Sequence, residues 1–463
     1  MSASFGSRLG LLRHPNFARL WTAATVSLFG TQISQIAIPF IAAVVLQASP
    51  GEVGLLTTIE FLPFLLFTLP AGVWVDRFPK RRLLVLGDLV RAAMLVSIPI
   101  AAAIPTGNGG HALTIWQLYI VGFVNGIATV FFDVADQSYL PTILERDELV
   151  EGNSKLQVSQ SSAQILGQPF GGGIIAVLSA PIAILIDAAS YIGSAGLILT
   201  IRERVGRALG SSGPVDPAGA IAADAFDGPT AESSVAAERD APIDPVTPGG
   251  GMRRQIMDGL HYILGHEYLG NIAATTATSN LFGNIGFAVF PVFAYRVLEL
   301  SPAAVGTMGG LAGVGVLLGA LTASRIQARL GVGRTIIATA ALFGPITLLV
   351  PIAEPATAFW LLSASLFVGG FNGVVYNIAQ VSLRQAITPE HFLGRMNATM
   401  RFLVWGTIPI GSVIGAVLSE LLTVRTTVWI SAILSFFACV PVLISTVGRI
   451  RTMPTGDPEA AAS

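Results

Sequence analysis

Long apolar runs, separated by short gaps of polar, glycine and proline residues, fill most of this 463-residue chain. A helix that crosses a membrane needs about 20 mainly apolar residues, and twelve runs approach or exceed that length. The predicted spans form two groups of six: 18–46, 53–75, 83–104, 113–138, 156–179 and 181–201, then 269–297, 303–325, 335–353, 357–386, 397–420 and 426–447. The pattern predicts an all-α polytopic membrane protein with two six-helix bundles.

The stretch that separates the two groups, 202–251, has a different composition. It is rich in Pro, Gly, Ala, Ser and Asp, which bury little apolar surface, so we predict a disordered cytoplasmic linker. After it, apolar residues recur at helical spacing among charges, which predicts an amphipathic helix on the membrane surface. The predicted organisation is therefore a first half (1–201), the linker, the amphipathic helix with the second half (252–450), and a cytoplasmic tail (451–463).

Composition supports a lipid environment and excludes several classes of protein. Hydrophobic residues make up 52% of the chain and charged residues 11%, whereas soluble domains carry about 25% charged residues. The net charge of −1 gives no reason to expect a nucleic-acid partner. The single Cys439 and five scattered histidines offer no disulfide and no metal-ligand spacing. The first apolar run exceeds the apolar region of a signal peptide, about 7–15 residues, so we expect a permanent helix.

The distribution of cations predicts the orientation. Twelve spans place both termini on one side of the membrane, and of the 26 Lys and Arg residues only Arg296 and Arg425 fall on the opposite side. Because cytoplasmic loops carry an excess of Lys and Arg, we expect both termini in the cytoplasm.

The two halves resemble each other in sequence. "SPGEVG" at 49 recurs as "SPAAVG" at 301, and "VGFVNG" at 121 recurs as "VGGFNG" at 368. "PFGGGIIAVLS" at 169 recurs as "PIGSVIGAVLS" at 409, with seven of eleven residues identical. Three pairs in the same order favour an internal duplication over independent use of Gly and Pro in membrane helices. Two halves related by a pseudo-twofold axis along the membrane normal are typical of transporters.

The loop after the second span, "GVWVDRFPKRR", is unusually rich in charge. Its residues Gly72, Asp76, Arg77, Lys80 and Arg81 match the motif G-x-x-x-D-R-x-G-[RK]-[RK], with Pro79 in place of the second glycine. On this motif the chain resembles the major facilitator superfamily.

The fifth span carries "GQPFGGG", which is similar to a helix 5 antiporter motif of that superfamily. Gly167, Pro169, Gly171 and Gly172 fit, although Gln168 intervenes. "LLRHPNFARLW" and "YLPTILERDELVEGNS" resemble bacterial drug and siderophore exporters of the macrolide-efflux and enterobactin-exporter type.

The resemblance implies that the charged loop is a gate. Gly72 would let the second helix approach a neighbour closely, and Asp76 would face the positive N-terminus of helix 11 near Asn397. Lys80 is expected to pair with Asp133 or Asp136 on helix 4. The alternative for the cations is that they only obey the positive-inside rule.

The resemblance also implies that helices 1, 4, 7 and 10 line the transport path, and each carries polar residues at helical spacing. Neutral amides mixed with aromatic residues favour a bulky, amphiphilic organic ligand, although such amides can equally tie helices together. The candidates are Thr31, Gln35, Asn125, Thr129, Asn280, Asn284, Asn372, Tyr376 and Gln380.

Three acids lie inside predicted spans, where a lone charge is costly. Asp88 stands three residues from Arg91, which predicts a structural ion pair. Asp187 is expected to be a structural hydrogen-bonding partner. Glu60 has no cation near it in sequence, so it is the candidate for proton coupling.

These features predict a secondary transporter, most simply a proton-coupled exporter of lipophilic or amphiphilic small molecules in a bacterial cell membrane. We expect a monomer in the lipid bilayer that uses a proton gradient and no ATP, since no Walker loop is present. No catalytic constellation indicates an enzyme. An importer or uniporter of the same fold, or a membrane scaffold that has lost transport, remain the alternatives.

Overall fold

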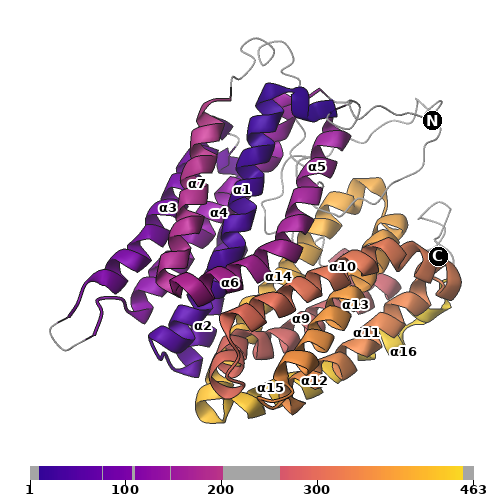
Figure 1. The fold of residues 1–463 in the computed structure, drawn as a ribbon. Helices are drawn as coiled ribbons and strands as arrows, with labels where there is room; N and C mark the ends of the chain where they lie inside the picture. Colours follow the sequence, from indigo (N-terminus) through magenta and orange to yellow (C-terminus); the bar gives the residue numbers. More distant parts are fainter. Residues whose placement is uncertain (1–9, 76, 107–109, 146–147, 202–260, 452–463) are drawn as a thin grey trace, which may run out of the picture.

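The computed structural model describes residues 10–75, 77–106, 110–145, 148–201 and 261–451 (Figure 1). The predicted linker, most of the predicted amphipathic helix and nearly all of the predicted tail lie outside these residues. The first half contains η1 (Gly10–Arg13), α1 (Pro15–Phe40), η2 (Ile41–Val45), α2 (Pro50–Val75), α3 (Lys80–Ala103), α4 (Ile115–Ile143), α5 (Leu149–Ser162), η3 (Ala163–Gly167), α6 (Gln168–Leu178) and α7 (Ala180–Leu199).

The second half is built in the same way and packs beside the first (Figure 1). It contains α9 (Glu267–Val292), η5 (Phe293–Val297), α10 (Pro302–Leu330), α11 (Val332–Thr347), α12 (Leu349–Ile352), α13 (Ala358–Ile387), α14 (Glu390–Leu421), α15 (Val424–Phe437), α16 (Val440–Ile444) and η6 (Thr446–Arg449).

Eleven helices among the described residues are long and apolar enough to cross a membrane. The predicted fifth span differs, because the continuous helical stretch from Leu149 to Leu178 is divided by the π-helical turn η3 into α5 and α6. The twelfth crossing therefore stays a prediction. Several helices extend beyond their predicted spans, since hydropathy detects only the apolar part of a helix. For example, α14 begins at Glu390 rather than at 397.

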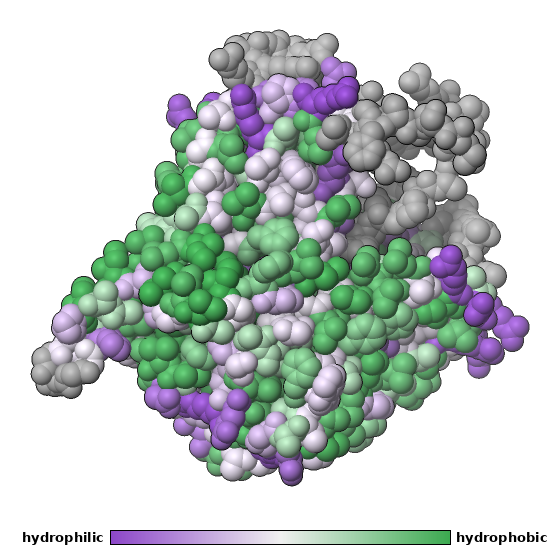
Figure 2. All heavy atoms as spheres, in the orientation of Figure 1, coloured by the Kyte–Doolittle hydropathy of each residue, from purple (hydrophilic) through white to green (hydrophobic). Residues whose placement is uncertain are grey.

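Large apolar side chains are exposed along the sides of both bundles, among them Trp116, Val177 and Trp360. Figure 2 shows them as a broad hydrophobic surface, with hydrophilic residues gathered toward the ends of the helices. Water would not tolerate so much exposed apolar area, whereas lipid does. The side-chain pattern therefore agrees with a multipass membrane protein.

The internal duplication is visible in local geometry. Each first helix of a half ends in a π-helical turn, η2 and η5, followed by a residue with positive φ, Gln47 (51°) and Glu299 (54°). The next helix then starts with a serine cap: Ser49 Oγ accepts from the Glu52 N–H and Ser301 Oγ accepts from the Ala304 N–H, both at 3.2 Å. Two unrelated segments would not share all three features.

Except for the helices that continue one another (α5 and α6, α11 and α12, α15 and α16), successive helices run in opposite directions, so the bundle has two polar faces (Figure 1). We call the face where α1 begins and η6 ends the terminal face; it holds the turns between α2 and α3, α10 and α11, and α13 and α14. The opposite, distal face holds the turns between α1 and α2, α3 and α4, and α14 and α15.

The two halves meet along α2–α14 and α6–α10. At the distal face the Gly51 N–H donates to Glu420 Oε1 at 2.7 Å, and Arg296 Nε donates to the Ala43 carbonyl at 2.5 Å. These contacts join residues from both halves and close the distal end of the seam between them.

Candidate functional site

The gate motif lies where α2 ends and α3 begins. The surroundings of Gly72, and Asp76 altogether, lie outside the described residues, so the contact of Asp76 with α14 stays a prediction. Asn397 lies on α14 and is half-buried. Arg77 is exposed, and Lys80 is the first residue of α3.

Arg81 has a contact that the charge pattern did not predict. Its Nε donates to the Ile198 carbonyl at 3.2 Å, and its Nη2 donates to the Leu199 carbonyl. The last carbonyls of a helix have no partner within the helix and carry partial negative charge, so a cation stabilises them. Arg81 thereby attaches the start of α3 to the end of α7.

The ion pairs among the described residues are Asp88–Arg91 at 2.5 Å and Glu151–Lys155 at 3.3 Å. Lys80 is in neither of them. Asp133 and Asp136, its predicted partners on α4, lie within electrostatic reach of Arg91 on α3. The pairing of Lys80 with either aspartate therefore stays a prediction.

The helix 5 motif forms a closely packed seam, and the structure brings all four of its residues to it. A Cβ added at Gly171 would lie 3.1 Å from the Ile33 Cα of α1, and one at Gly172 would lie 2.3 Å from the Pro302 carbonyl oxygen of α10. Gly167 faces the side chain of Gln32, and Pro169 packs against Gly310. Only glycine permits such close approach of backbones, so the motif joins α6 to α1 and to α10.

Two segments resemble drug exporters, the N-terminal segment 11–21 and the segment 139–154 before the fifth span, and they contact each other near the terminal face. The Leu11 N–H donates to Glu151 Oε1 at 3.1 Å, and Trp21 Nε1 donates to the Lys155 carbonyl at 3.3 Å. The Leu11 N–H, and then Lys155, hold the pKa of Glu151 below its usual value. These contacts attach α5 to the start of α1.

The predicted path-lining residues of the second half make contacts between helices. Asn280 Nδ2 donates to the Val404 carbonyl of α14 at 3.5 Å, and Asn372 Nδ2 donates to the Thr339 carbonyl of α11 at 2.9 Å. The Tyr376 hydroxyl bonds to Thr276 of α9 at 2.8 Å. Asn284 and Gln380 bond within their own helices, to Asn280 and Asn377.

In the first half, Gln35 is exposed, Asn125 and Thr129 are half-buried, and Asn125 Oδ1 is buried without a hydrogen-bond partner. Thr31 Oγ1 bonds to the Tyr191 hydroxyl of α7 at 2.8 Å. Thr31 and Asn372 therefore tie helices together within a half, which was the alternative to a path-lining role.

Glu60 lies on α2 against α4. A Cβ added at Gly122 would lie 3.0 Å from Glu60 Cγ, and one at Gly126 would lie 2.9 Å from its carbonyl oxygen. The side chain is half-buried, and none of the hydrogen bonds or ion pairs among the described residues includes its carboxylate. The two glycines of α4 thus make room for an acid that no described side chain neutralises.

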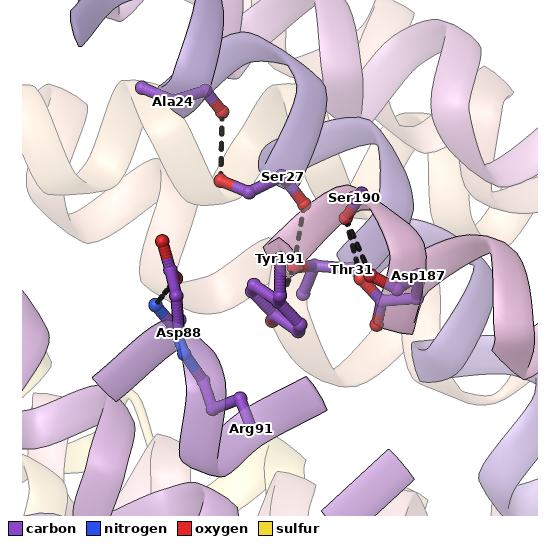
Figure 3. Close-up of polar contacts among 8 residues, drawn as sticks. All are labelled: Ala24, Ser27, Thr31, Asp88, Arg91, Asp187, Ser190 and Tyr191. Carbon is purple, nitrogen blue, oxygen red and sulfur yellow. Dashed lines mark hydrogen bonds and ion pairs between the residues drawn. The ribbon is translucent and has the colours of Figure 1, made fainter. Parts of the chain in front are cut away.

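A cluster of buried polar residues joins α1, α3 and α7 (Figure 3). Arg91 pairs with Asp88, which confirms the predicted pair, and its guanidinium lies 4.1 Å from the ring centre of Phe132 and 4.3 Å from that of Tyr191. Cation–π contacts of this kind partly replace the water that a buried guanidinium loses. The pair was detectable from its spacing, but its aromatic neighbours come from α4 and α7.

Asp187 accepts hydrogen bonds from Ser34 of α1 and from Ser190 of α7, the latter at 3.2 Å. This confirms its prediction as a hydrogen-bonding partner. Sequence reasoning missed Ser34 as that partner, because the polar stripe on the first span pointed to the transport path.

Comparison with known proteins decides the family. The sequence model described as Major Facilitator Superfamily matches residues 20–247 and 269–461. This protein belongs to that superfamily. The superfamily is not an enzyme class, and membership agrees with a multipass protein of a bacterial membrane.

Curated relatives match only part of the chain. It is 26% identical to the uncharacterized MFS-type transporter YkuC of Bacillus subtilis over 42% of this chain and 43% of that protein. It is 28% identical to macrolide efflux protein A of Streptococcus pyogenes, over 32% and 35% of the two chains. The multidrug efflux pump Tap of Mycobacterium tuberculosis is 28% identical over 38% and 40%. The matches span less than half the length of these relatives.

Solved structures match the whole fold. A bacterial homologue of the iron transporter ferroportin in an inward-facing state has a TM-score of 0.68 at 15% identity, covering 94% of this chain and 98% of that one. A D-xylose–proton symporter has a TM-score of 0.62 at 13% identity, covering 93% and 97%. At such identities the similarity establishes the fold of the superfamily alone.

Proposed function

We propose that this protein is a secondary active transporter that exports lipophilic or amphiphilic small molecules from a bacterial cell by alternating access. Family membership supports transport, and the names of two partial relatives, a macrolide efflux protein and a multidrug efflux pump, support export. The protein acts as a monomer in the bilayer, and nucleic acid is not among its partners.

The observation that carries this proposal is the closed distal end of the seam between the halves. Gly172 packs against Pro302, Gly51 bonds to Glu420, and Arg296 bonds to the Ala43 carbonyl. The excess of Lys and Arg at the terminal face supports a cytoplasmic location for that face. A conformation closed at its distal face is the one in which an exporter takes substrate from inside the cell.

The driving force in this proposal is a proton gradient, and Glu60 is the candidate carrier. Glu60 lies ten residues from the start of α2, which corresponds to a depth of about 15 Å below the distal face. A half-buried carboxyl group at that depth without a described ionic partner can be neutralised by a proton. In the expected cycle, Glu60 takes up a proton when the distal face opens and releases it when the terminal face opens.

Transport in proteoliposomes tests the proposal. Proteoliposomes that hold the wild-type protein inside-out, with a lumen more acidic than the bath, should accumulate ethidium or a macrolide against its gradient. Glu60→Gln should abolish that accumulation while preserving downhill exchange. Glu354→Gln, an exposed glutamate at the distal face, is the matched control and should behave as wild type.

The other outcomes distinguish the alternatives. Accumulation only with the opposite gradient would identify an importer, and flux that never becomes uphill would identify a uniporter. Absence of flux for every probe in a well-folded preparation would favour a scaffold. Normal uphill accumulation by Glu60→Gln would exclude Glu60 as the carrier.

A further inference from the structure

We propose that Asp187, held by Ser34 and Ser190 between α1 and α7, is a proton-binding site inside the first half, in addition to Glu60. The proposal rests on proton coupling in the function proposed above. It places the site within one bundle rather than in the seam between the two.

The carboxyl group of Asp187 is buried and closely surrounded, and Figure 3 shows it bonded to Ser190 of the same helix. Its side chain is 1% exposed, and it accepts from the Ser34 and Ser190 hydroxyls. A Cβ added at Gly30 would lie 2.6 Å from Asp187 Oδ1 and 2.3 Å from Ser190 Oγ, so glycine at this position leaves the space that the carboxyl group occupies. Asp187 lies seven residues from the start of α7, about 10 Å below the distal face.

The charges around Asp187 do not balance. Its neighbouring elements contribute Asp88 and Arg91 from α3 and Tyr191 from α7, and Asp133 and Asp136 of α4 lie within electrostatic reach of Arg91. Arg91 pairs with Asp88 at 2.5 Å. Asp187 therefore needs another positive charge, because an uncompensated carboxylate in the membrane interior is costly.

A proton fits this requirement better than a metal ion. The oxygen atoms that contact the Asp187 carboxyl are two serine hydroxyls, whereas Ca²⁺ takes about 6–8 oxygen ligands. A hydroxyl can donate to a carboxylate or accept from a carboxylic acid. Addition of H⁺ to one carboxyl oxygen therefore lets Ser34 change from donor to acceptor, and the hydrogen bond persists in both protonation states.

An unpaired atom nearby supports a second arrangement of the cluster. Among the described residues Arg91 Nε is buried without a hydrogen-bond partner, while the Ser194 hydroxyl lies beside the Asp88 carboxyl group. Arg91 also lies within electrostatic reach of Asp187. In the arrangement observed, Arg91 pairs with Asp88 alone, which is expected when Asp187 carries a proton. Loss of that proton would draw the guanidinium toward Asp187.

Such a shift would be transmitted to α1. Tyr191 stacks on the Arg91 guanidinium, and its hydroxyl bonds to Thr31 of α1 at 2.8 Å. Ser34, one turn further along α1, bonds to Asp187 itself. Movement of Arg91 therefore changes contacts of α1 at two points, which is how proton release in this bundle would reach the seam.

Infrared difference spectra between acid and alkaline pH, recorded on the full chain in lipid nanodiscs, test proton binding without any substrate. Wild type should give carbonyl bands of protonated buried carboxyl groups, one of them from Glu60. Asp187→Asn should remove one band, which Glu60→Gln leaves in place and which Ser34→Ala shifts, because one hydrogen bond is lost.

Bands in Asp187→Asn that are identical to those of wild type would overturn the proposal. If Asp187→Asn does not fold, Ser34→Ala decides, since an unshifted band would then overturn it. If Asp187→Asn loses its band but the wild-type protein transports none of the probes, this proton site stands and the proposed function is rejected. Loss of pH-driven accumulation in Asp187→Asn, with downhill exchange preserved, would support both.

Discussion

The two halves share a backbone plan but differ in what they bury. α3 and α11 begin at Lys80 and Val332, 252 residues apart, the same separation as Gln47 and Glu299. At that separation Asp88 corresponds to Ala340 and Arg91 corresponds to Phe343. The ion pair of the first half is therefore replaced by two apolar residues in the second.

The same contrast holds on α7 and α15, which begin at Ala180 and Val424, 244 residues apart. Asp187 corresponds to Ser431, and Tyr191 corresponds to Ser435. Ser431 Oγ donates to the Phe282 carbonyl of α9 at 2.7 Å, and Ser435 Oγ donates to the Ser431 carbonyl of its own helix at 2.8 Å. The fold needs no buried charge at these positions, so the charges of the first half require a reason other than architecture.

The largest effect is expected from removal of the cation of the first half. Arg91→Leu leaves Asp88 buried without its partner and should lower the free energy of unfolding by about 3–5 kcal/mol. Ser431→Ala in the second half removes one hydroxyl and should cost about 1 kcal/mol. Denaturant unfolding of both variants in micelles measures the difference.

The double variant Asp88→Leu/Arg91→Leu is the control, because it removes both charges and should recover much of the lost stability. Equal costs for Arg91→Leu and Ser431→Ala would show that the two halves do not differ energetically.

A smaller effect is expected where the halves meet. Gly172→Ala would bring its Cβ to 2.3 Å from the Pro302 carbonyl oxygen, whereas Gly173 has nothing within 4 Å of its added Cβ. Overpacking of this kind costs about 1–3 kcal/mol, so Gly172→Ala should disfavour the closed distal face and Gly173→Ala should not. Cysteines at Gly51 and Glu420, in a Cys439→Ser background, should crosslink less in Gly172→Ala. Identical crosslinking in both variants would contradict the seam.

A difference between the halves is also expected at the gate. Asp76→Asn loses the attraction to the positive end of α14, about 1–2 kcal/mol in favourable geometry, and should reduce transport about tenfold while the protein still folds. At the corresponding position the second half has Ala328, and Ala328→Ser should leave transport unchanged. Initial transport rates measure both, and wild-type rates in Asp76→Asn would exclude the latch.

The smallest effect is expected from the segment that connects the halves. Removal of about twenty residues within 208–250 should leave transport largely intact, since a flexible tether tolerates changes in length. Transport by a well-expressed deletion variant is the measurement. Complete loss of activity would mean that this segment does more than connect the two bundles.

Local patterns were sufficient to predict much of this protein. Apolar runs located the helices, and the repeated "SP" and glycine motifs identified two related halves, because hydropathy and helix starts depend on neighbouring residues. The Asp88–Arg91 pair was predicted for the same reason, since residues three apart lie on one face of a helix.

The partners of single polar residues were decided only by the tertiary structure. Ser34 faces Asp187 across 153 residues, Asn372 bonds to α11, and Arg81 holds the end of α7. Membrane helices are apolar on most sides, so their sequence does not mark which side faces a neighbour. A polar residue on the first span is equally compatible with a transport path or with a hydrogen bond to the sixth span. Helix packing makes that choice, because a buried polar group is stable only where another helix supplies its hydrogen bond.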